Sequence, residues 1–159
     1  MTIRRVQRAD VPAVVGLVHE LAAYEREPES CHLTEAQLEA ALFADAPALF
    51  GHVAEVDGEV VAMALWFLNF STWRGTHGIH LEDIFVRPDQ RGSGLGRRLI
   101  ATLARECVDR GFERLEWVVL DWNEPARGFY RAIGATEVDE WITNRVTDDA
   151  LREIAGRAG

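Results

Sequence analysis

A two-residue turn, Asp57-Gly58, constrains the fold of this chain more than any other feature. It separates two segments whose apolar residues predict β-strands, residues 50–56 and 60–70, and Asp-Gly between two such segments indicates a hairpin. Part of the sheet must therefore be antiparallel. From residue 79 onward, strand-type segments alternate with helical segments, and such units require helices packed on a sheet. The sequence predicts an α/β fold with a mixed, mostly antiparallel sheet flanked by helices.

The expected elements follow one another along the whole chain, with no linker between them. The predicted strands are residues 2–6, 50–56, 60–70, 79–86, 115–120 and 137–146. Asp10, the Thr34/Gln37 pair and Asn123 are suited to cap helices, and two further helices are predicted over 94–110 and 148–157. A length of 159 residues, of which 48% are hydrophobic, suits one compact domain that covers residues 1–159.

The charge of the chain argues against several classes of partner. Seventeen basic and 26 acidic residues give a net charge of -9, whereas nucleic acids and anionic membranes attract basic surfaces. All 17 basic residues are arginine, which excludes a lysine Schiff base and a P-loop lysine. We therefore expect neither nucleic acid nor membrane among the partners.

The cysteines, histidines and apolar runs indicate a cytoplasmic protein without a metal. Cys31 and Cys107 have neither CxxC nor metal-ligand spacing, and the five histidines show no metal spacing either. No apolar run approaches the roughly 18 residues of a membrane span. The polar segment Met1–Asp10 does not have the pattern of a signal peptide.

The first candidate site is a glycine-rich turn over residues 91–96, Arg-Gly-Ser-Gly-Leu-Gly, between an expected strand and an expected helix. Glycines adopt positive φ and let a ligand approach the backbone, and the N–H groups at the start of a helix favour phosphate oxygens. The turn lacks the lysine of a P-loop, and Arg97 stands where a dinucleotide fingerprint requires glycine. This context favours an anion site over a simple tight turn.

Two carboxylates, Glu82 and Asp83, interrupt the otherwise apolar strand 79–86. Adjacent strand residues point to opposite faces, so at least one of the two tends toward an interior or a cleft. A buried carboxylate without a partner is costly. It is therefore either paired with an arginine or used in function, and the sequence leaves both possibilities open.

A tyrosine on an expected helix is the third candidate. Tyr130 lies seven residues after Asn123, which is about two helical turns, and its phenol is suited to act as an acid. Taken alone, Tyr130 is more simply a packing residue beside Phe129, and Asn123 is more simply a helix cap.

Together these motifs resemble the GNAT superfamily of acetyl-CoA-dependent N-acetyltransferases, and the resemblance covers nearly the whole chain. It rests on Arg91-x-x-Gly94-x-Gly96 between a strand and a helix and on Asn123-x-x-Ala126-x-x-x-Tyr130. Within the superfamily, the chain is similar to the diamine and thialysine acetyltransferases, which include spermidine/spermine acetyltransferase-like proteins. That similarity is carried by residues 20–25, 71–75, 81–86, 91–96 and 121–125. The polyamine branch has an acidic residue at the position of Ser71. The stretch 71–75 of this chain instead resembles the thialysine branch.

The resemblance implies a role for each matching residue. Tyr130 is implied as the acid that protonates the leaving thiolate, and Glu82 as the carboxylate that accepts the amine proton through water. The implied acetyl-CoA contacts are Ile84, Phe85, Val86, Arg91, Gly92, Ser93, Gly94, Leu95, Gly96, Arg97, Asn123 and Ala126. The implied acceptor pocket consists of Tyr24, Glu25, Trp73, Asp83 and Trp141. A homodimer is implied as well.

The chemistry of amine acetylation requires such a site. An alkyl ammonium ion with a pKa near ~10.4 leaves roughly one molecule in a thousand neutral at pH 7, and only the neutral amine attacks a thioester. A carboxylate in the pocket attracts the cation and then takes its proton. We therefore expect direct transfer from acetyl-CoA to a small-molecule primary amine: a thialysine-like amino acid, a diamine or a polyamine. Because Ser71 removes one negative charge, the first two are favoured over spermine.

Two other functions stay open from the sequence. The chain could bind acetyl-CoA as a sensor or interaction module without turnover, or it could acetylate protein N-termini or antibiotics. Tyr130 and Glu82 argue against a pure binder, because binding alone requires neither residue.

Overall fold

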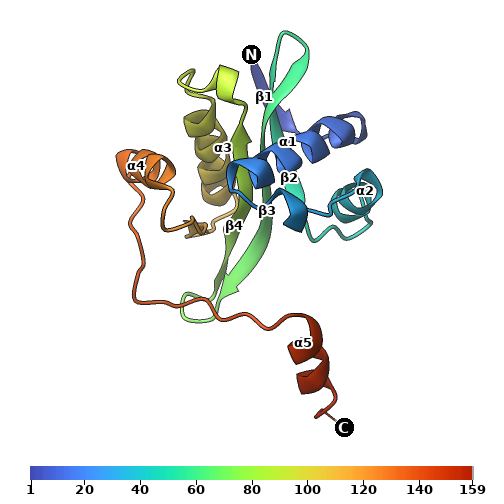
Figure 1. Cartoon of the computed structure of the whole chain (residues 1–159). Helices are drawn as coiled ribbons and strands as arrows, with labels where there is room; N and C mark the ends of the chain where they lie inside the picture. The colour runs from blue at the N-terminus through green and yellow to red at the C-terminus, as the bar shows by residue number, and fades with distance from the viewer. Residues whose placement is uncertain (159) are drawn as a thin grey trace. The chain divides into compact units, whose positions relative to one another are not determined.

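A five-stranded sheet forms the centre of the first part of the chain (Figure 1). The structure, a computed structural model, describes residues 1–158. Its contacts divide the chain into two compact units, Met1–Val118 and a second unit that begins at Val119. Each unit has its own helices, and the organisation of residues 1–159 as one domain stays a prediction.

The strands lie side by side in chain order. Their bounds are Thr2–Arg5 (β1), Phe50–Val56 (β2), Glu59–Ser71 (β3), Thr76–Val86 (β4) and Leu115–Glu116 (β5). The first four strands pair antiparallel with their neighbours, and β5 pairs parallel with β4. The predicted α/β fold with a mixed, mostly antiparallel sheet is confirmed.

The turn between β2 and β3 is the hairpin that the sequence predicts. Asp57 and Gly58 have φ values of 52° and 84°, and a two-residue type I′ turn requires positive φ at both positions. From this turn, β2 pairs with β3 over its whole length. The turn sets the first pairs of the hairpin, and the extra residue Val61 then shifts the register of the rest of β3 by one residue, which decides which side chains of β3 face each side of the sheet.

Three α-helices belong to the first unit: Val11–Tyr24 (α1), Glu35–Leu42 (α2) and Leu95–Asp109 (α3). The capping box predicted at the start of α2 is confirmed. The Thr34 Oγ1 atom accepts a hydrogen bond from the N–H of Gln37 at 3.3 Å, and Gln37 Oε1 accepts one from the N–H of Thr34 at 3.0 Å.

The side chain of Asp10 does not cap α1 as the sequence predicts. Its carboxylate instead accepts hydrogen bonds from the N–H of Gln7 at 2.8 Å and from Arg4 Nη1 at 2.6 Å. The Arg4 guanidinium holds the pKa of the Asp10 carboxyl below its usual range. An ion pair with Arg4 of β1, six residues earlier, thus takes the carboxylate that a cap would use, and the composition of the helix start does not reveal this competition.

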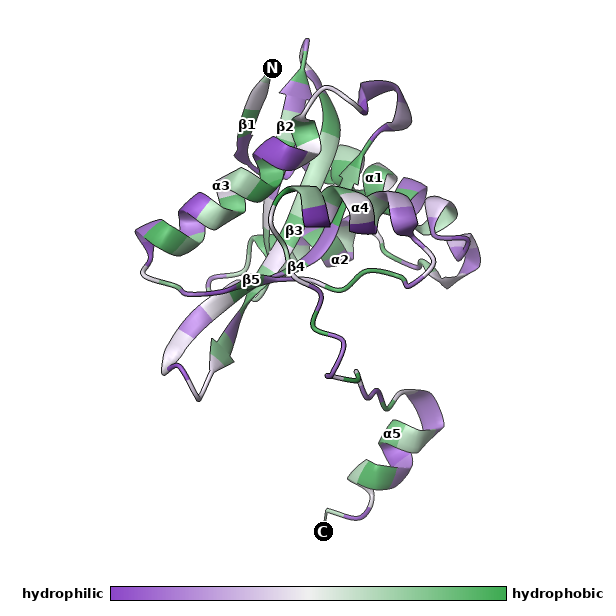
Figure 2. Cartoon of the chain, turned by 90° about the vertical axis from the view of Figure 1, so that its left-hand side faces the viewer, coloured by the Kyte–Doolittle hydropathy of each residue, from purple (hydrophilic) through white to green (hydrophobic). Residues whose placement is uncertain are grey.

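Helices cover both faces of the sheet in the first unit (Figure 1). The helices α1 and α2 pack on one face, where Val14, Leu17 and Leu38 meet Met63 of β3 and Phe85 of β4. On the opposite face lies α3, which contacts β2, β3, β4 and β5. Figure 2 shows apolar and polar residues alternating along α3, as expected for a helix with one buried face. The strand β3 therefore lies in a core between two helical layers.

The second unit contains α4 (Glu124–Ala132) and α5 (Asp148–Ala155). The predicted cap at the start of α4 is confirmed, because Asn123 Oδ1 accepts a hydrogen bond from the N–H of Ala126 at 3.4 Å. Two arginines of α4, Arg127 and Arg131, pair with Glu137 at 2.8 and 3.2 Å. These ion pairs hold the segment after α4 against that helix.

Two predicted strands are wrong, one in part and one in whole. Of residues 115–120, only Leu115–Glu116 pair with β4. Residues 137–146 form no strand. A strand is stable only where a neighbour satisfies its backbone groups, and the apolar pattern of one segment does not contain that partner.

No helix within residues 1–158 is both long enough and apolar enough to span a membrane.

Candidate active site

The glycine-rich turn after β4 presents backbone donors at the start of α3. Gly92 and Gly94 have φ values of 79° and 83°, and Gly94 occupies the cap position of α3 without a side-chain cap. The Ser93 Oγ atom donates a hydrogen bond to the carbonyl of Gln90 at 2.6 Å, which tightens the turn. The first N–H groups of any helix have no partner within that helix. In this turn they form a site suited to a phosphate group.

The space around these glycines is open to a ligand. A Cβ atom built on Gly92 or Gly94 would meet no atom within 4 Å. The glycines are therefore required by their positive φ and not by crowding within the protein, and the open space lets a ligand approach the backbone. Arg97 lies in the first turn of α3 and adds positive charge beside the donors. The turn has the backbone and the charge that a phosphate-bearing ligand requires, and its binding of a coenzyme diphosphate stays a prediction.

One edge of β4 is open beside this turn. Pairing between β4 and β5 is confined to Ile79–Leu115 and His80–Glu116, whereas β3 pairs with β4 as far as Val86. Within residues 1–158, no strand therefore pairs with the outer edge of β4 beyond His80. Residues 84–86, the expected coenzyme contacts, lie on this stretch. Its backbone groups, of which the Val86 carbonyl already accepts a hydrogen bond from Arg91 Nε, are suited to bind an extended amide-containing chain.

A β-bulge in β4 places the two adjacent carboxylates. Leu65 of β3 pairs with Asp83, but the next residue of β3 pairs with Leu81, so Glu82 is the extra residue of the bulge. Bulges bend a strand and change where its side chains point. The side chain of Glu82 is 56% exposed, and its Oε2 atom lies 3.9 Å from His80 Nε2. Asp83 is mostly buried.

Glu25, Glu82 and Asp83 form what we call the acidic cluster. Burial, and after it the charges of Glu82 and Glu25, together raise the pKa of Asp83 to about 6. Burial also raises the pKa of Glu25, which follows directly after α1. Among the described residues, no arginine forms an ion pair with Asp83. Of the two possibilities that the sequence leaves open, the geometry favours use over a salt bridge.

Trp73 does not join the acidic cluster of its own chain. It lies in the turn between β3 and β4, and it is 90% exposed. Asp83 comes seven residues after Thr76, the first residue of β4, and at about 3.3 Å per strand residue this corresponds to about 23 Å. Within one chain, Trp73 is therefore remote from Asp83. Tyr24, the last residue of α1, lies against Arg91 of the glycine-rich turn.

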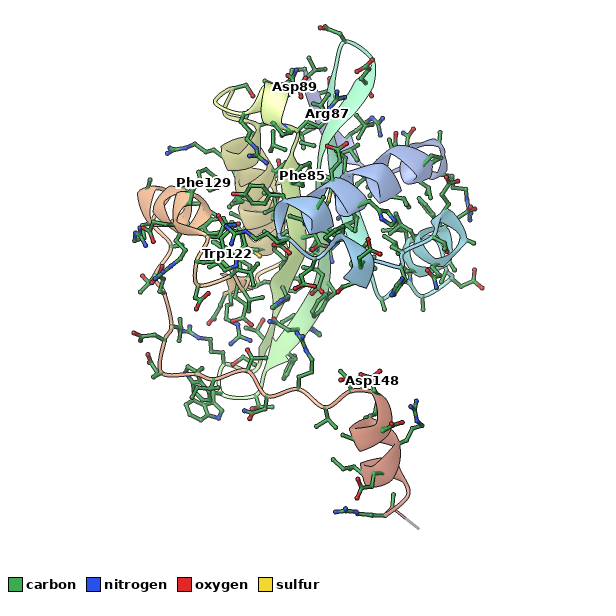
Figure 3. All side chains as sticks on the ribbon, viewed as in Figure 1. Phe85, Arg87, Asp89, Trp122, Phe129 and Asp148 are labelled. Atoms are coloured by element: carbon green, nitrogen blue, oxygen red, sulfur yellow. The ribbon has the colours of Figure 1, made fainter. Side chains whose placement is uncertain are left out.

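The remaining expected site residues belong to the second unit. Asn123 is buried, and its side chain caps α4 at Ala126. Tyr130 is half-buried on α4, with its ring centroid 5.4 Å from that of Phe129, which Figure 3 labels. The packing contact expected from the sequence is thus present, and it leaves the acid role of Tyr130 a prediction. Trp141 is 71% exposed.

His80 is a neighbour of the acidic cluster to which the sequence analysis assigns no role. Its ring stacks on Phe67 of β3 at 4.8 Å between centroids, and its Nε2 atom faces Glu82. The spacing His80-x-Glu82 on one strand is the signal that would have indicated this proximity. Throughout the described part of the chain, no group of three or more His, Cys, Asp or Glu residues is arranged to hold a metal ion.

The chain is similar to known proteins in sequence and in fold. The sequence matches the Acetyltransferase (GNAT) family over residues 15–135. It is 37% identical to the thialysine N-epsilon-acetyltransferase of Bos taurus and 34% identical to that of Sus scrofa, and each alignment covers 98% of this chain and 97% of the relative. Among solved structures, an integron cassette protein from the mobile metagenome of V. cholerae matches with a TM-score of 0.81 and 25% identity, over 97% of this chain and 96% of that one.

Proposed function

The chain belongs to the acetyltransferase (GNAT) family and is an acetyl-CoA-dependent N-acetyltransferase, and from this premise we propose that its acceptor is a short primary amine, either a thialysine-like amino acid or a diamine. The observation that carries the proposal is the acidic cluster at the bulge of β4. Its buried member, Asp83, has other carboxylates and no arginine among its partners. A cationic amine is the ligand that such a cluster attracts.

The glycine-rich turn and the open edge of β4 supply the coenzyme side of the proposed site. Acetyl-CoA, when bound, supplies the acetyl group as an activated thioester. The N–H groups of residues 92–97 hold its diphosphate, and the guanidinium of Arg97 adds charge. The backbone of Ile84 and Val86 pairs with the amide groups of its extended arm. Asn123 and Ala126, at the start of α4, are the proposed further contacts.

The two carboxylates of β4 have different roles toward the amine: one binds it and the other accepts its proton. Asp83, ionised above its pKa of about 6, holds the ammonium group in the pocket. Glu82, whose side chain is exposed at the bulge, accepts the amine proton at a carboxylate oxygen through water. The amine then becomes the neutral nucleophile that the reaction requires. Tyr130 Oη donates a proton to the departing sulfur.

The transfer is proposed to be direct, with no acyl group held on the protein. The two cysteines, Cys31 and Cys107, are free thiols. Cys107 is buried on α3, and burial raises the pKa of its thiol, which disfavours the nucleophilic thiolate. Free thiols also support the proposal of a reducing cytoplasmic location.

The acceptor proposal rests further on the relatives and on Ser71. The Bos taurus and Sus scrofa relatives are named as thialysine acetyltransferases, and this chain shares their length. A short amine reaches the acidic cluster with one ammonium group. A spermine molecule, in contrast, carries further positive charges. Ser71 provides no carboxylate for them, and because Ser71 pairs with Thr76 at the far end of β4, it would lie near an acceptor only from a second copy.

We also propose that the enzyme acts as a homodimer. Large apolar side chains of the second unit are exposed, with Trp141 at 71% and Ile142 at 83%, and a second copy would cover them. Trp73 lies in the turn before β4, too far from Asp83 to reach the acidic cluster of its own chain. It would therefore contribute to an acceptor pocket only from the second copy.

A thiol-release assay tests the proposed function. Acetyl-CoA is offered with thialysine, lysine, putrescine, spermidine, spermine and an N-terminal peptide, and acetyl-CoA binding is measured in parallel by calorimetry. We expect thialysine or putrescine to give the highest kcat/KM. Preference for the peptide would contradict the acceptor proposal, and binding without thiol release from any amine would favour a sensor. As a control on the acid, Tyr130→Phe should keep acetyl-CoA affinity and lower kcat by about a hundredfold.

A further inference from the structure

Arg91 joins the glycine-rich turn to the end of β4. Its Nε–H donates a hydrogen bond to the carbonyl of Val86 at 3.1 Å. Val86 is the last residue of β4, and Arg91 opens the turn that leads into α3. The side chain therefore reaches back from the turn onto the strand whose open edge is proposed to bind the coenzyme arm.

The same side chain contacts the acceptor side of the site. The guanidinium carbon of Arg91 lies 4.9 Å from the centroid of the Tyr24 ring and 5.6 Å from that of Phe85. Tyr24 ends α1, and Phe85 packs from β4 into the core beneath α1 (Figure 3). A guanidinium over aromatic faces is attracted to both rings. Arg91 thus holds the end of α1 near the turn.

Arg91 makes these contacts without neutralising the acidic cluster. Glu25 follows Tyr24 directly in the chain, yet within residues 1–158 Arg91 forms no ion pair with a carboxylate. Arg87, four residues earlier on the same loop, behaves differently and pairs with Glu59 at 3.6 Å and Asp89 at 3.5 Å. The charge of Arg91 is therefore directed to two rings and a carbonyl, and the cluster keeps its attraction for a cation.

We propose that Arg91 is a positioning residue that couples the two halves of the site, so that a coenzyme bound at the turn raises the affinity of the pocket for the amine. This inference rests on the proposed function. An anion that orders the backbone of residues 91–96 also fixes the base of the Arg91 side chain. The fixed guanidinium then holds Tyr24 at the end of α1, beside Glu25. The conformational entropy of the Tyr24 side chain is then lost when the coenzyme binds. The amine does not have to order Tyr24 again, so it binds more tightly.

The coupling is measured by titrating thialysine into the protein by calorimetry, without CoA and with saturating CoA. In the wild type, CoA should tighten thialysine binding about fivefold, the factor that a partly exposed cation–π contact provides. Arg91→Met should lose this factor. Arg91→Lys should retain part of it, because lysine keeps the positive charge but lacks the planar guanidinium group. The matched control, Arg87→Met on the same loop, should keep the full factor.

Variants of Tyr24 make the test independent of how well Arg91→Met folds. Tyr24→Phe keeps the ring and should keep the coupling, whereas Tyr24→Leu should lose it. Combining Tyr24→Leu with Arg91→Met should lose no more than either change alone. An unchanged factor in Arg91→Met or in Tyr24→Leu, in an enzyme that still acetylates thialysine, would overturn the inference and leave the proposed function standing. Failure of the wild type to release thiol with any amine would instead overturn the proposed function.

Discussion

The two sides of β4 build their halves of the active site from different chemical groups. On the side of the glycine-rich turn, the groups that meet a ligand belong to the backbone, and they are placed by the positive φ of Gly92 and Gly94. On the side of α1, they are the carboxylates of Glu25, Glu82 and Asp83. In the proposed function, the backbone side recognises the phosphates and amides that every acetyl-CoA molecule carries, and the carboxylate side selects the acceptor.

This difference means that the two halves should respond separately to substitution. A change of charge in the acidic cluster leaves the backbone donors of the turn in place, and a change of φ in the turn leaves the carboxylates in place. The residues that link the halves should be few, and Arg91 contacts Tyr24 beside Glu25 as well as the carbonyl of Val86. A substitution in one half should therefore change the affinity for one ligand, and an equal loss of affinity for both ligands would contradict this separation.

The largest effects are expected on the carboxylate side. Glu82→Gln removes the proton acceptor and should lower kcat by about 10²- to 10⁴-fold with little change in KM for the amine. Asp83→Asn removes the charge that holds the ammonium group and should act mainly by raising that KM. Steady-state kinetics with thialysine, together with calorimetry of acetyl-CoA, separates the two roles.

Glu113→Gln is the matched control for these charge changes. Glu113 is about half exposed and pairs with Arg74 at 2.9 Å, so its loss should leave both kinetic constants unchanged. If Glu82→Gln raised KM alone while Asp83→Asn lowered kcat alone, the proposed division between the two carboxylates would be reversed. If acetyl-CoA affinity fell in step with activity, the halves would not be separate.

A smaller effect is expected on the backbone side. Gly94→Val forces a β-branched residue to adopt a φ of 83°, which costs about 1–2 kcal/mol, so the start of α3 should shift and acetyl-CoA affinity should fall about tenfold. Calorimetry measures this loss, and the affinity for thialysine without CoA should not change. Gly16→Ala, on α1 with open space around it, is the control. Equal acetyl-CoA affinity in Gly94→Val and the wild type would exclude the turn as the diphosphate site. The fivefold coupling expected of Arg91 is smaller still.

The backbone side could be predicted from the sequence because its signals are local. The glycines of the turn act within a few residues. The Thr34/Gln37 capping box and the Asp57-Gly58 hairpin, elsewhere in the fold, are local in the same way, and the structure has each of these turns and caps in place. The carboxylate side needs contacts between distant segments. Sequence periodicity places Glu82 and Asp83 on opposite faces, and only the pairing of β4 with Leu65 of β3 reveals the bulge that separates their environments.

The failures of prediction have the same cause. Asp10 is a good cap by composition, but its carboxylate bonds to Arg4 of β1. The segments 115–120 and 137–146 have the pattern of strands, but a strand also requires a neighbour, and that neighbour is not encoded in the segment. The place of Trp73 in the acceptor pocket stays a prediction: the length of β4 keeps it away from Asp83 in one chain, so a second copy would have to supply it.

The pH dependence of kcat/KM tests most directly whether the acidic cluster selects the amine. Burial and two neighbouring carboxylates raise the pKa of Asp83 to about 6, and only its ionised form holds an ammonium group. The kcat/KM of the wild type for thialysine should therefore fall about tenfold per pH unit below pH ~6, and this limb should be absent in Asp83→Asn. A wild-type profile that stays flat down to pH ~5, or an identical limb in Asp83→Asn, would contradict the account.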